Sequence, residues 1–273
     1  MRRHLLRMAV PAVLAGTVLL GCSRKSPAPP DPGPSRAAAF TVHTPCVISG
    51  PIQKVVIAYE ESHPGAKIDT ATDKPLAMLG AVKGEKAEPG VVLTLGEVEM
   101  DDLISAGAVD PAQVVPVARN AYQLAVIVPA ENEALEHLSD LAGPKAKRVA
   151  IEDPKLSTLG NRTEQALRKL GLWGKIAPKV VRFDPTKNVL SELLAGKADA
   201  AFVYQDCLFA EGGSPPRTVR LLATLPSDSY APITYRAAPL KRTGQSPQAA
   251  DFVKWLISAE GKKALQKAGL SPP

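Results

Sequence analysis

Two cysteines outside the N-terminal segment are the residues best suited to chemistry in this sequence. Cys46 lies in "FTVHTPCVISGP", where a predicted strand runs into a loop and then into a helix that begins at Pro51, and Cys207 ends "FVYQDC". Two thiolates together favour Cu(I), Zn(II) or a thiophilic metalloid. Further ligands of such a site would come from His43, Met78 or Asp73. A disulfide and two inert, buried thiols are the alternatives, and geometry decides among the three.

No comparable set of residues indicates an enzyme active site. The sequence has no Gly-x-Ser-x-Gly elbow, no phosphate-binding loop and no dinucleotide-binding glycine motif. His63 falls in a predicted helix-ending turn, and His137 is predicted to be a surface or capping residue. A nucleophile without an oriented base is not activated. The sequence therefore predicts no enzymatic activity and no cofactor.

The N-terminal residues predict export and lipid attachment. Arginines at 2, 3 and 7 precede an apolar run that ends in "LLGC", which is the pattern of a secretory signal and resembles a bacterial lipobox. We expect residues 1–21 to be a lipoprotein signal peptide, Cys22 to carry lipid, and residues 22–37 to be a proline-rich tether. An ordinary cleaved signal or an uncleaved anchor is the alternative. The predicted location is the cell envelope, with the body facing the periplasm or the exterior.

The positive net charge belongs mostly to this export segment. The whole chain carries +6, but residues 1–37 hold six basic residues and one aspartate, a net +5, which leaves +1 for residues 38–273. Aromatic residues make up 4% of the chain, and no basic and aromatic residues interleave as in a nucleic-acid-binding surface. We therefore expect no nucleic-acid partner.

The remaining residues alternate between short apolar runs and amphipathic segments. Predicted strands begin at residues 40, 66, 90, 122, 148, 179 and 198, and predicted helices begin at residues 51, 97, 161 and 186. Several of these helices stop at a glycine, as left-handed C-terminal positions prefer: Gly107, Gly171 and Gly196. Such alternation favours parallel sheets covered by helices on both faces. Ligands of such sheets bind at the carboxyl ends of the strands, beside helix N-termini.

Several segments, in order, resemble the periplasmic molybdate-binding proteins, which are type II solute-binding proteins of ABC importers. Among them are "AYEESHPGAKI", "DDLISAGAV", "VARNAYQLAVIVP", "IEDPK" and "ADAAFVY", and the resemblance covers roughly residues 40–270. It implies an α/β fold of two lobes, the type II or Venus-flytrap fold, with a parallel-rich sheet in each lobe. The ligand would lie in a cleft that closes by a hinge motion. We expect lobe 1 to span about 38–118 plus 208–273, and lobe 2 about 119–207.

Members of that family hold a tetrahedral oxyanion with serine hydroxyls from two loops, backbone amides and one tyrosine. Amides at helix N-termini carry partial positive charge and can replace the water that a dianion loses. In the first loop the resemblance places Val47, which has no hydroxyl, where the family has serine, and Cys46 is its neighbour. Ser49 is the hydroxyl that could take over the role.

The second loop, "TATDKPL", departs further from the family. Asp73 or Lys74 stands in place of the second serine, and Thr72 is the nearest hydroxyl. An aspartate that faces a dianion repels it. Thr72 and Ser49 are therefore the hydroxyl donors that we expect if the ligand is an oxyanion.

The other lobe keeps more of the family pattern. The frame of "EDPKLSTLG" places the amide of Leu159 near the ligand, although Thr158 stands where the family usually has proline. Thr186 falls at the second amide position, after an inserted Pro185, and Tyr204 matches the family tyrosine. Glu97 and Glu99 fall in the first turn of a predicted helix, where the helix dipole favours acidic side chains.

The resemblance brings Cys46 and Cys207 to loops that border one cleft, because Cys207 follows Tyr204 by three residues. The predicted function is therefore a substrate-binding lipoprotein of a molybdate-type ABC transporter that captures a molybdate-like or tungstate-like anion. Its partners would be a small inorganic ligand and a membrane permease, and the protein would act as a monomer. The alternatives are a binder of a soft metal or metalloid through Cys46 and Cys207, and an accessory or sensor lipoprotein without a role in transport.

Overall fold

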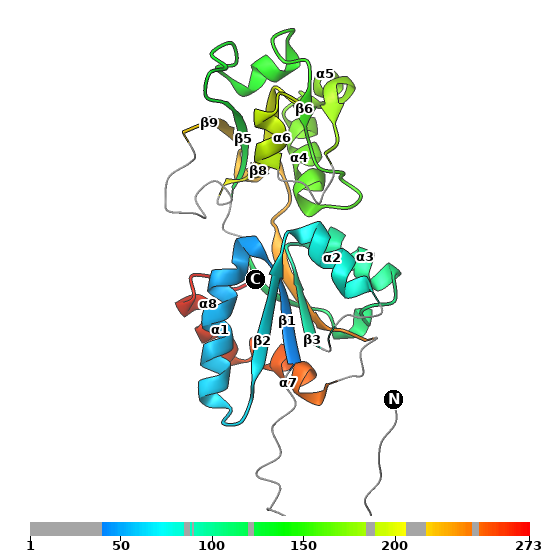
Figure 1. Cartoon of the computed structure of the whole chain (residues 1–273), viewed down its shortest axis with the longest axis vertical. Helices are drawn as coiled ribbons and strands as arrows, with labels where there is room; N and C mark the ends of the chain where they lie inside the picture. The colour runs from blue at the N-terminus through cyan, green and yellow to red at the C-terminus, as the bar shows by residue number, and fades with distance from the viewer. Residues whose placement is uncertain are drawn as a thin grey trace, which may run out of the picture. The chain divides into compact units, whose positions relative to one another are not determined.

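Two five-stranded sheets form the framework of the protein (Figure 1). The computed structural model describes residues 40–84, 88, 90–119, 123–183, 189–205, 217–241 and 246–273. The strand orders are β2-β1-β3-β10-β4 and β7-β6-β8-β5-β9. Strand β10 runs antiparallel to both of its neighbours, and so does β5, whereas the other pairings are parallel. The predicted α/β class with a parallel-rich sheet in each of two lobes is confirmed.

The first sheet and its helices make up the first lobe. Its strands are β1 (Phe40–Pro45), β2 (Ile68–Asp73), β3 (Gly90–Thr94), β4 (Val115–Arg119) and β10 (Thr234–Pro239). Strands β1 and β3 are buried along their whole length, as expected of parallel strands covered on both faces. In the parallel pair of β1 and β2, Pro45 lies opposite Asp73. The loops that follow these two strands therefore leave the same edge of the sheet.

The described residues of this lobe include five α-helices. They are α1 (Ser49–Ser62), α2 (Pro75–Lys83), α3 (Glu97–Ser105), α7 (Pro247–Leu256) and α8 (Ala259–Lys267), with the short 3-10 turns η1 (Cys46–Ile48) and η2 (Pro111–Gln113). Proline begins α2 and α7, where a missing N–H costs nothing. Helix α3 is followed by Gly107 at a φ of 69°, as the sequence predicted.

The second sheet and its helices make up the second lobe. Its strands are β5 (Leu124–Pro129), β6 (Val149–Ala150), β7 (Val180–Val181), β8 (Ala200–Tyr204) and β9 (Val219–Thr224). Its helical elements are η3 (Leu138–Ala142), α4 (Thr158–Lys169), α5 (Trp173–Ile176), η4 (Ala177–Lys179) and α6 (Val189–Leu194). Helix α4 begins three residues earlier than predicted, because the Ser157 side chain caps its N-terminus. Gly171 and Gly196 both have a φ of 70°.

The chain passes between the two sheets twice. It leaves the first sheet after β4, enters the second with β5, and returns between β9 and β10 through η6 (Ser227–Ser229). We expected the return at residue 208, but β9 pairs antiparallel with β5. Backbone hydrogen bonds to β5 thus keep Val219–Thr224 in the second lobe, and the second crossing begins only after Thr224.

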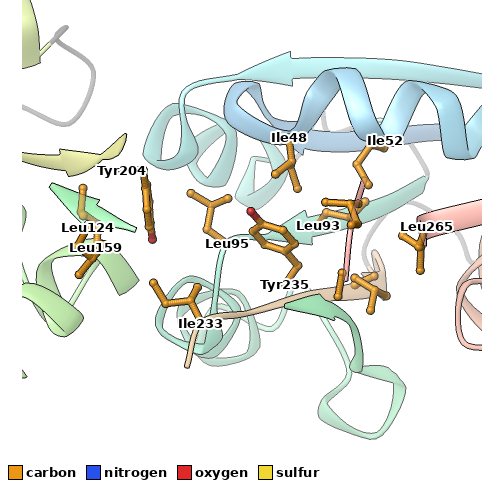
Figure 2. Close-up of a cluster of buried hydrophobic side chains, with 14 of the residues drawn as sticks. Ile48, Ile52, Leu93, Leu95, Leu124, Leu159, Tyr204, Ile233, Tyr235 and Leu265 are labelled. Atoms are coloured by element: carbon orange, nitrogen blue, oxygen red, sulfur yellow. The ribbon is translucent and has the colours of Figure 1, made fainter. Parts of the chain in front are cut away.

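Apolar side chains gather in three clusters. The largest contains residues of both lobes, and Figure 2 shows part of it. The second joins α2 and α3 to the first sheet through Met78, Met100 and Leu103, and the third places Leu193 of α6 against the second sheet. Met100 is 1% exposed, which confirms its predicted place in the core. All the described residues fall in one compact unit.

The predicted export segment lies outside the described residues, and with it Cys22. Among the helices that the structure describes, none has the length and apolar character needed to span a bilayer.

Candidate functional site

The loop after β1 closes into a tight turn at the start of α1. The Ser49 N–H and the Ser49 hydroxyl both donate to the Cys46 carbonyl oxygen, the hydroxyl at 2.8 Å. A serine hydroxyl has one proton to donate, and in this arrangement it is used within the turn. Val47 packs against the largest apolar cluster. The side chains of the first loop thus stabilise the turn, and the positive end of α1 follows it.

The end of β2 presents a carboxylate beside this turn. Thr72 and Asp73 are exposed, and Asp73 Oδ1 accepts the N–H of Lys74 at 2.7 Å. Cys46 is an exposed, free cysteine. Partial burial of its thiol raises the pKa of Cys46, and the nearby charge of Asp73 adds to the rise. A raised pKa disfavours the thiolate, which is the form that binds metals.

In the second lobe the N-terminus of α4 forms a set of amides suited to an anion. Ser157 Oγ accepts the Gly160 N–H at 3.4 Å and donates to the Glu152 carboxyl group. Thr158 and Leu159 begin the helix, and amides of a first helical turn have no acceptor within the helix. They also carry the positive end of the helix dipole. The Leu159 amide, which the resemblance assigns to the ligand, thus belongs to the first turn of a 12-residue helix.

Tyr204 ends strand β8 and lies opposite Leu124 of β5. Its side chain is 4% exposed and that of Leu159 is 5% exposed. Both belong to the largest apolar cluster, together with Leu95 after β3 and Ile233 before β10 (Figure 2). Tyr204 and Leu159 thus both belong to this cluster, which also contains apolar residues of the first lobe, and their predicted contacts with a ligand remain a prediction.

A polar contact joins the two lobes directly. The N–H of Thr158, at the start of α4, donates to Glu99 Oε1 of α3 at 2.8 Å, and the Thr158 hydroxyl donates to Glu99 Oε2. Thr158 is 0% exposed and Glu99 is 2% exposed. A carboxylate of the first lobe is thus bound by an amide of the second lobe.

An ion pair lies beside this contact. Arg162 of α4 donates to Glu97 of α3, and its other terminal nitrogen donates to Asn161 Oδ1 at 2.7 Å. Its side chain is 6% exposed, against 29% for that of Glu97. A guanidinium this deeply buried needs its partners, because an unpaired charge in such a place is costly.

The environment of Glu99 favours its neutral form. Burial raises the pKa of Glu99 to about 7, the hydrogen bonds from Thr158 oppose this rise, and the charge of Glu152 adds to it. Burial likewise raises the pKa of Glu152, and its hydrogen bond from Ser157 opposes the rise. Two carboxyl groups with raised pKa values therefore lie next to the α4 N-terminus.

Sequence reasoning assigned Glu97 and Glu99 to the first turn of a helix, which is correct, but missed that they reach the other lobe. The signal that could have shown it is helical spacing. The buried residues of α3 are Glu99, Met100 and Leu103, so Glu99 shares the core-facing side of the helix with apolar residues. A carboxylate on that side requires a buried partner.

The proposed soft-metal site finds no support among the described residues. They contain no group of three or more His, Cys, Asp and Glu side chains that could hold a metal ion. His43 lies within β1 with its ring Nε2 3.4 Å from the Glu88 carbonyl oxygen, and Met78 of α2 is buried in the core. Cys207 and Thr186 lie outside the described residues, so their predicted roles remain predictions.

The sequence model of the bacterial extracellular solute-binding proteins matches residues 40–271. The chain belongs to this family. A relative named as ABC transporter substrate-binding lipoprotein YvgL, from Bacillus subtilis (strain 168), is 22% identical over 264 residues, which is 96% of each chain. Molybdate-binding protein ModA of Haemophilus influenzae is 28% identical over 127 residues, which is 46% of this chain and 48% of that relative.

Solved structures of solute-binding proteins share the fold. The periplasmic molybdate-binding protein of Azotobacter vinelandii superimposes with a TM-score of 0.59 at 20% identity, over 86% of this chain and 99% of that chain. At this identity the likeness establishes the fold alone. The resemblance seen in the sequence and the two-lobed, type II fold that it implied are both confirmed for this solute-binding protein.

Proposed function

We propose that this protein is the substrate-binding lipoprotein of a molybdate-type ABC importer. It captures a small oxyanion such as molybdate or tungstate between its lobes and presents the closed form to a membrane permease. Lipid on Cys22 holds it at the membrane, facing the periplasm or the exterior, and it acts as a monomer. Membership of the solute-binding family supports the general role, and the names of its molybdate-binding relatives support the choice of ligand.

The observation that carries the proposal is the first turn of α4. Its Thr158 amide already binds a carboxylate, and the adjacent Leu159 amide points from the same positively polarised turn. Tyr204 lies in one apolar cluster with Leu159. A buried site of this kind strengthens the hydrogen bonds of an oxyanion, because little water competes for them.

The first lobe contributes fewer hydroxyls than the family pattern requires. The Ser49 hydroxyl donates its proton within its own turn, and Val47 has no hydroxyl group. Asp73 adds a negative charge at the same edge of the sheet. We therefore assign the first-lobe contacts mainly to backbone amides at the start of α1, with Thr72 as the remaining hydroxyl. The Thr186 amide is the other donor that we propose for the second lobe.

Thermal unfolding of the purified protein against molybdate, tungstate and sulfate tests this assignment. A ligand that binds only the folded state at 100 times its dissociation constant stabilises it by about 2.7 kcal/mol. For a protein of this size such a gain corresponds to a clear rise of several degrees in Tm. We expect the rise with molybdate and tungstate.

The control is a Cys46→Ser/Cys207→Ser double variant, with Zn(II), Cu(I) and arsenite as additional ligands under reducing conditions. Stabilisation by molybdate that survives the double substitution supports the oxyanion function. Stabilisation by a thiophilic species alone, lost in the double variant, would refute it in favour of a soft-ligand site. No shift with any of these ligands would refute both and leave the accessory role.

A further inference from the structure

Helices α3 and α4 meet although they belong to different lobes. Helix α3 is anchored to the first sheet through Met100 and Leu103, and α4 to the second lobe through Ala166 and Leu167. Among the described elements, the chain crosses between the lobes after β4 and after β9. A hinge motion at the crossings would therefore separate α3 from α4. Their contact would be lost if such a motion opened the protein.

The contact has the form of an anion bound at a helix N-terminus. Glu99 accepts two hydrogen bonds from Thr158, one from the backbone and one from the hydroxyl. Both residues are almost fully buried, at 2% and 0% exposure. A carboxylate next to first-turn amides gains from the helix dipole as well as from charge-assisted hydrogen bonds. An external oxyanion would use interactions of the same kind at the neighbouring Leu159 amide.

The approach of the two helices is closer than most side chains permit. Gly96 caps α3, and a Cβ atom added there would collide with the side chain of Thr158. Beside it, Glu97 pairs with the buried Arg162. The start of α3 thus fits against α4. Gly96 leaves room for the Thr158 side chain, Glu99 accepts hydrogen bonds from Thr158, and Glu97 pairs with Arg162.

We propose that the carboxyl group of Glu99 is an internal ligand of the α4 N-terminus that holds the two lobes together and thereby determines how tightly the protein retains its solute. Glu99 is a positioning residue, because it acts through the lobes and not by touching the solute. A solute enclosed between two lobes leaves only when they separate, so interactions made only in the closed form slow its release. The part of this inference that concerns the solute rests on the proposed function, whereas the part that concerns the lobes does not.

The test compares Glu99→Ala with Glu99→Gln. Glutamine keeps both contacts, since its amide oxygen can accept the Thr158 N–H and its amide nitrogen can donate to the Thr158 hydroxyl. Alanine loses both. Thr158→Val serves as a second disruptive variant that keeps the side-chain shape. Asp102→Asn is the matched control, because Asp102 lies on the same helix and pairs with Lys83 within the first lobe.

Reaction of Arg162 with phenylglyoxal, quantified by mass spectrometry in protein without added ligand, reports whether the lobes separate. Arg162 is shielded by the contact, whereas the side chain of Arg168 on the same helix is 60% exposed and serves as an internal reference. We expect about tenfold faster modification of Arg162 in Glu99→Ala, a smaller increase in Thr158→Val, and wild-type rates in Glu99→Gln and Asp102→Asn. Affinity for molybdate should weaken by a similar factor in the two disruptive variants alone.

Two results would overturn the inference. Wild-type rates of Arg162 modification in Glu99→Ala would show that Glu99 does not hold the lobes. Faster modification with unchanged molybdate affinity would show that the contact does not govern retention of the solute. If the wild-type protein does not bind molybdate, the proposed function fails, and Arg162 modification alone then decides whether Glu99 holds the lobes.

Discussion

At the scale of single residues, Glu99 is an acidic side chain that is only 2% exposed. It accepts hydrogen bonds from Thr158 in a place with little solvent to stabilise a negative charge, and the nearby charge of Glu152 opposes a second one. Desolvation outweighs the two hydrogen bonds, so a large fraction of Glu99 stays protonated up to about pH 7. The folded protein thus binds a proton at Glu99 over a range of pH in which the unfolded chain does not.

This difference predicts a pH-dependent stability. The pKa of Glu99 rises from 4.5 to about 7 on folding, so the free energy of unfolding should fall as pH rises from about 4.5 to about 7. The slope attributable to this residue is at most about 1.4 kcal/mol per pH unit. Urea unfolding of the wild type and of Glu99→Gln at a series of pH values measures it. We expect the wild type to lose stability relative to the variant across this window.

The matched control for this measurement is Glu164→Gln on α4, since Glu164 pairs with the exposed Arg168. The free energy of unfolding of Glu164→Gln should change with pH in parallel with that of the wild type. Glu152 is present in all three proteins, and because its charge interacts with that of Glu99, its contribution changes in Glu99→Gln but not in Glu164→Gln. Parallel curves for the wild type and Glu99→Gln would contradict the assignment of a raised pKa to Glu99.

At the scale of elements, the fit of α3 against α4 depends on Gly96. Replacing Gly96 with alanine adds a methyl group where the Thr158 side chain lies, and overpacking of this kind costs about 1 to 3 kcal/mol. We therefore expect Gly96→Ala to lower the free energy of unfolding by that amount, measured in urea. Gly80 lies within α2 with no atom near the position of an added Cβ. Gly80→Ala should instead raise stability by up to about 1 kcal/mol, and equal losses at both glycines would contradict the steric argument.

The elements also show which features the sequence could reveal. The buried parallel strands β1, β3 and β8 and the glycine stops at 107, 171 and 196 were predicted, because continuous apolar runs and left-handed glycines are local signals. Strands β4, β9 and β10 were missed. Their segments mix arginine, proline and threonine with apolar residues, and each is a strand because partners distant in sequence supply its hydrogen bonds.

The candidate site shows the same division between features predicted from local patterns and features that depend on residues distant in sequence. Resemblance placed Leu159 and Tyr204 in the second lobe, where the structure brings them into one cluster. The role of Ser49 in closing its own turn depends on the backbone path after β1. The pairing of Glu99 with Thr158 depends on how two lobes meet, which no local pattern records. Contacts between separate lobes are therefore the part of the site that required a structure.

At the scale of the whole molecule, the two lobes share one core despite having separate sheets. The largest apolar cluster contains Leu95 and Tyr235 of the first lobe and Leu159 and Tyr204 of the second (Figure 2). Glu99 and Arg162 add polar contacts across the same boundary. Unfolding one lobe would expose the apolar surface that it shares with the other, so the lobes should lose their structure together.

Two tryptophans allow this cooperativity to be measured, because each lobe has one. Trp255 packs edge-on against Tyr59 in the first lobe, and Trp173 lies beneath Arg168 in the second. In Trp173→Phe the fluorescence follows the first lobe, and in Trp255→Phe it follows the second. We expect the fluorescence midpoint in urea to equal the midpoint from far-UV circular dichroism in each variant, even if their stabilities differ. A fluorescence midpoint displaced from the dichroism midpoint would mean that the shared cluster and the Glu99 contact are too weak to couple the lobes. In that case the closed arrangement would depend on solute alone.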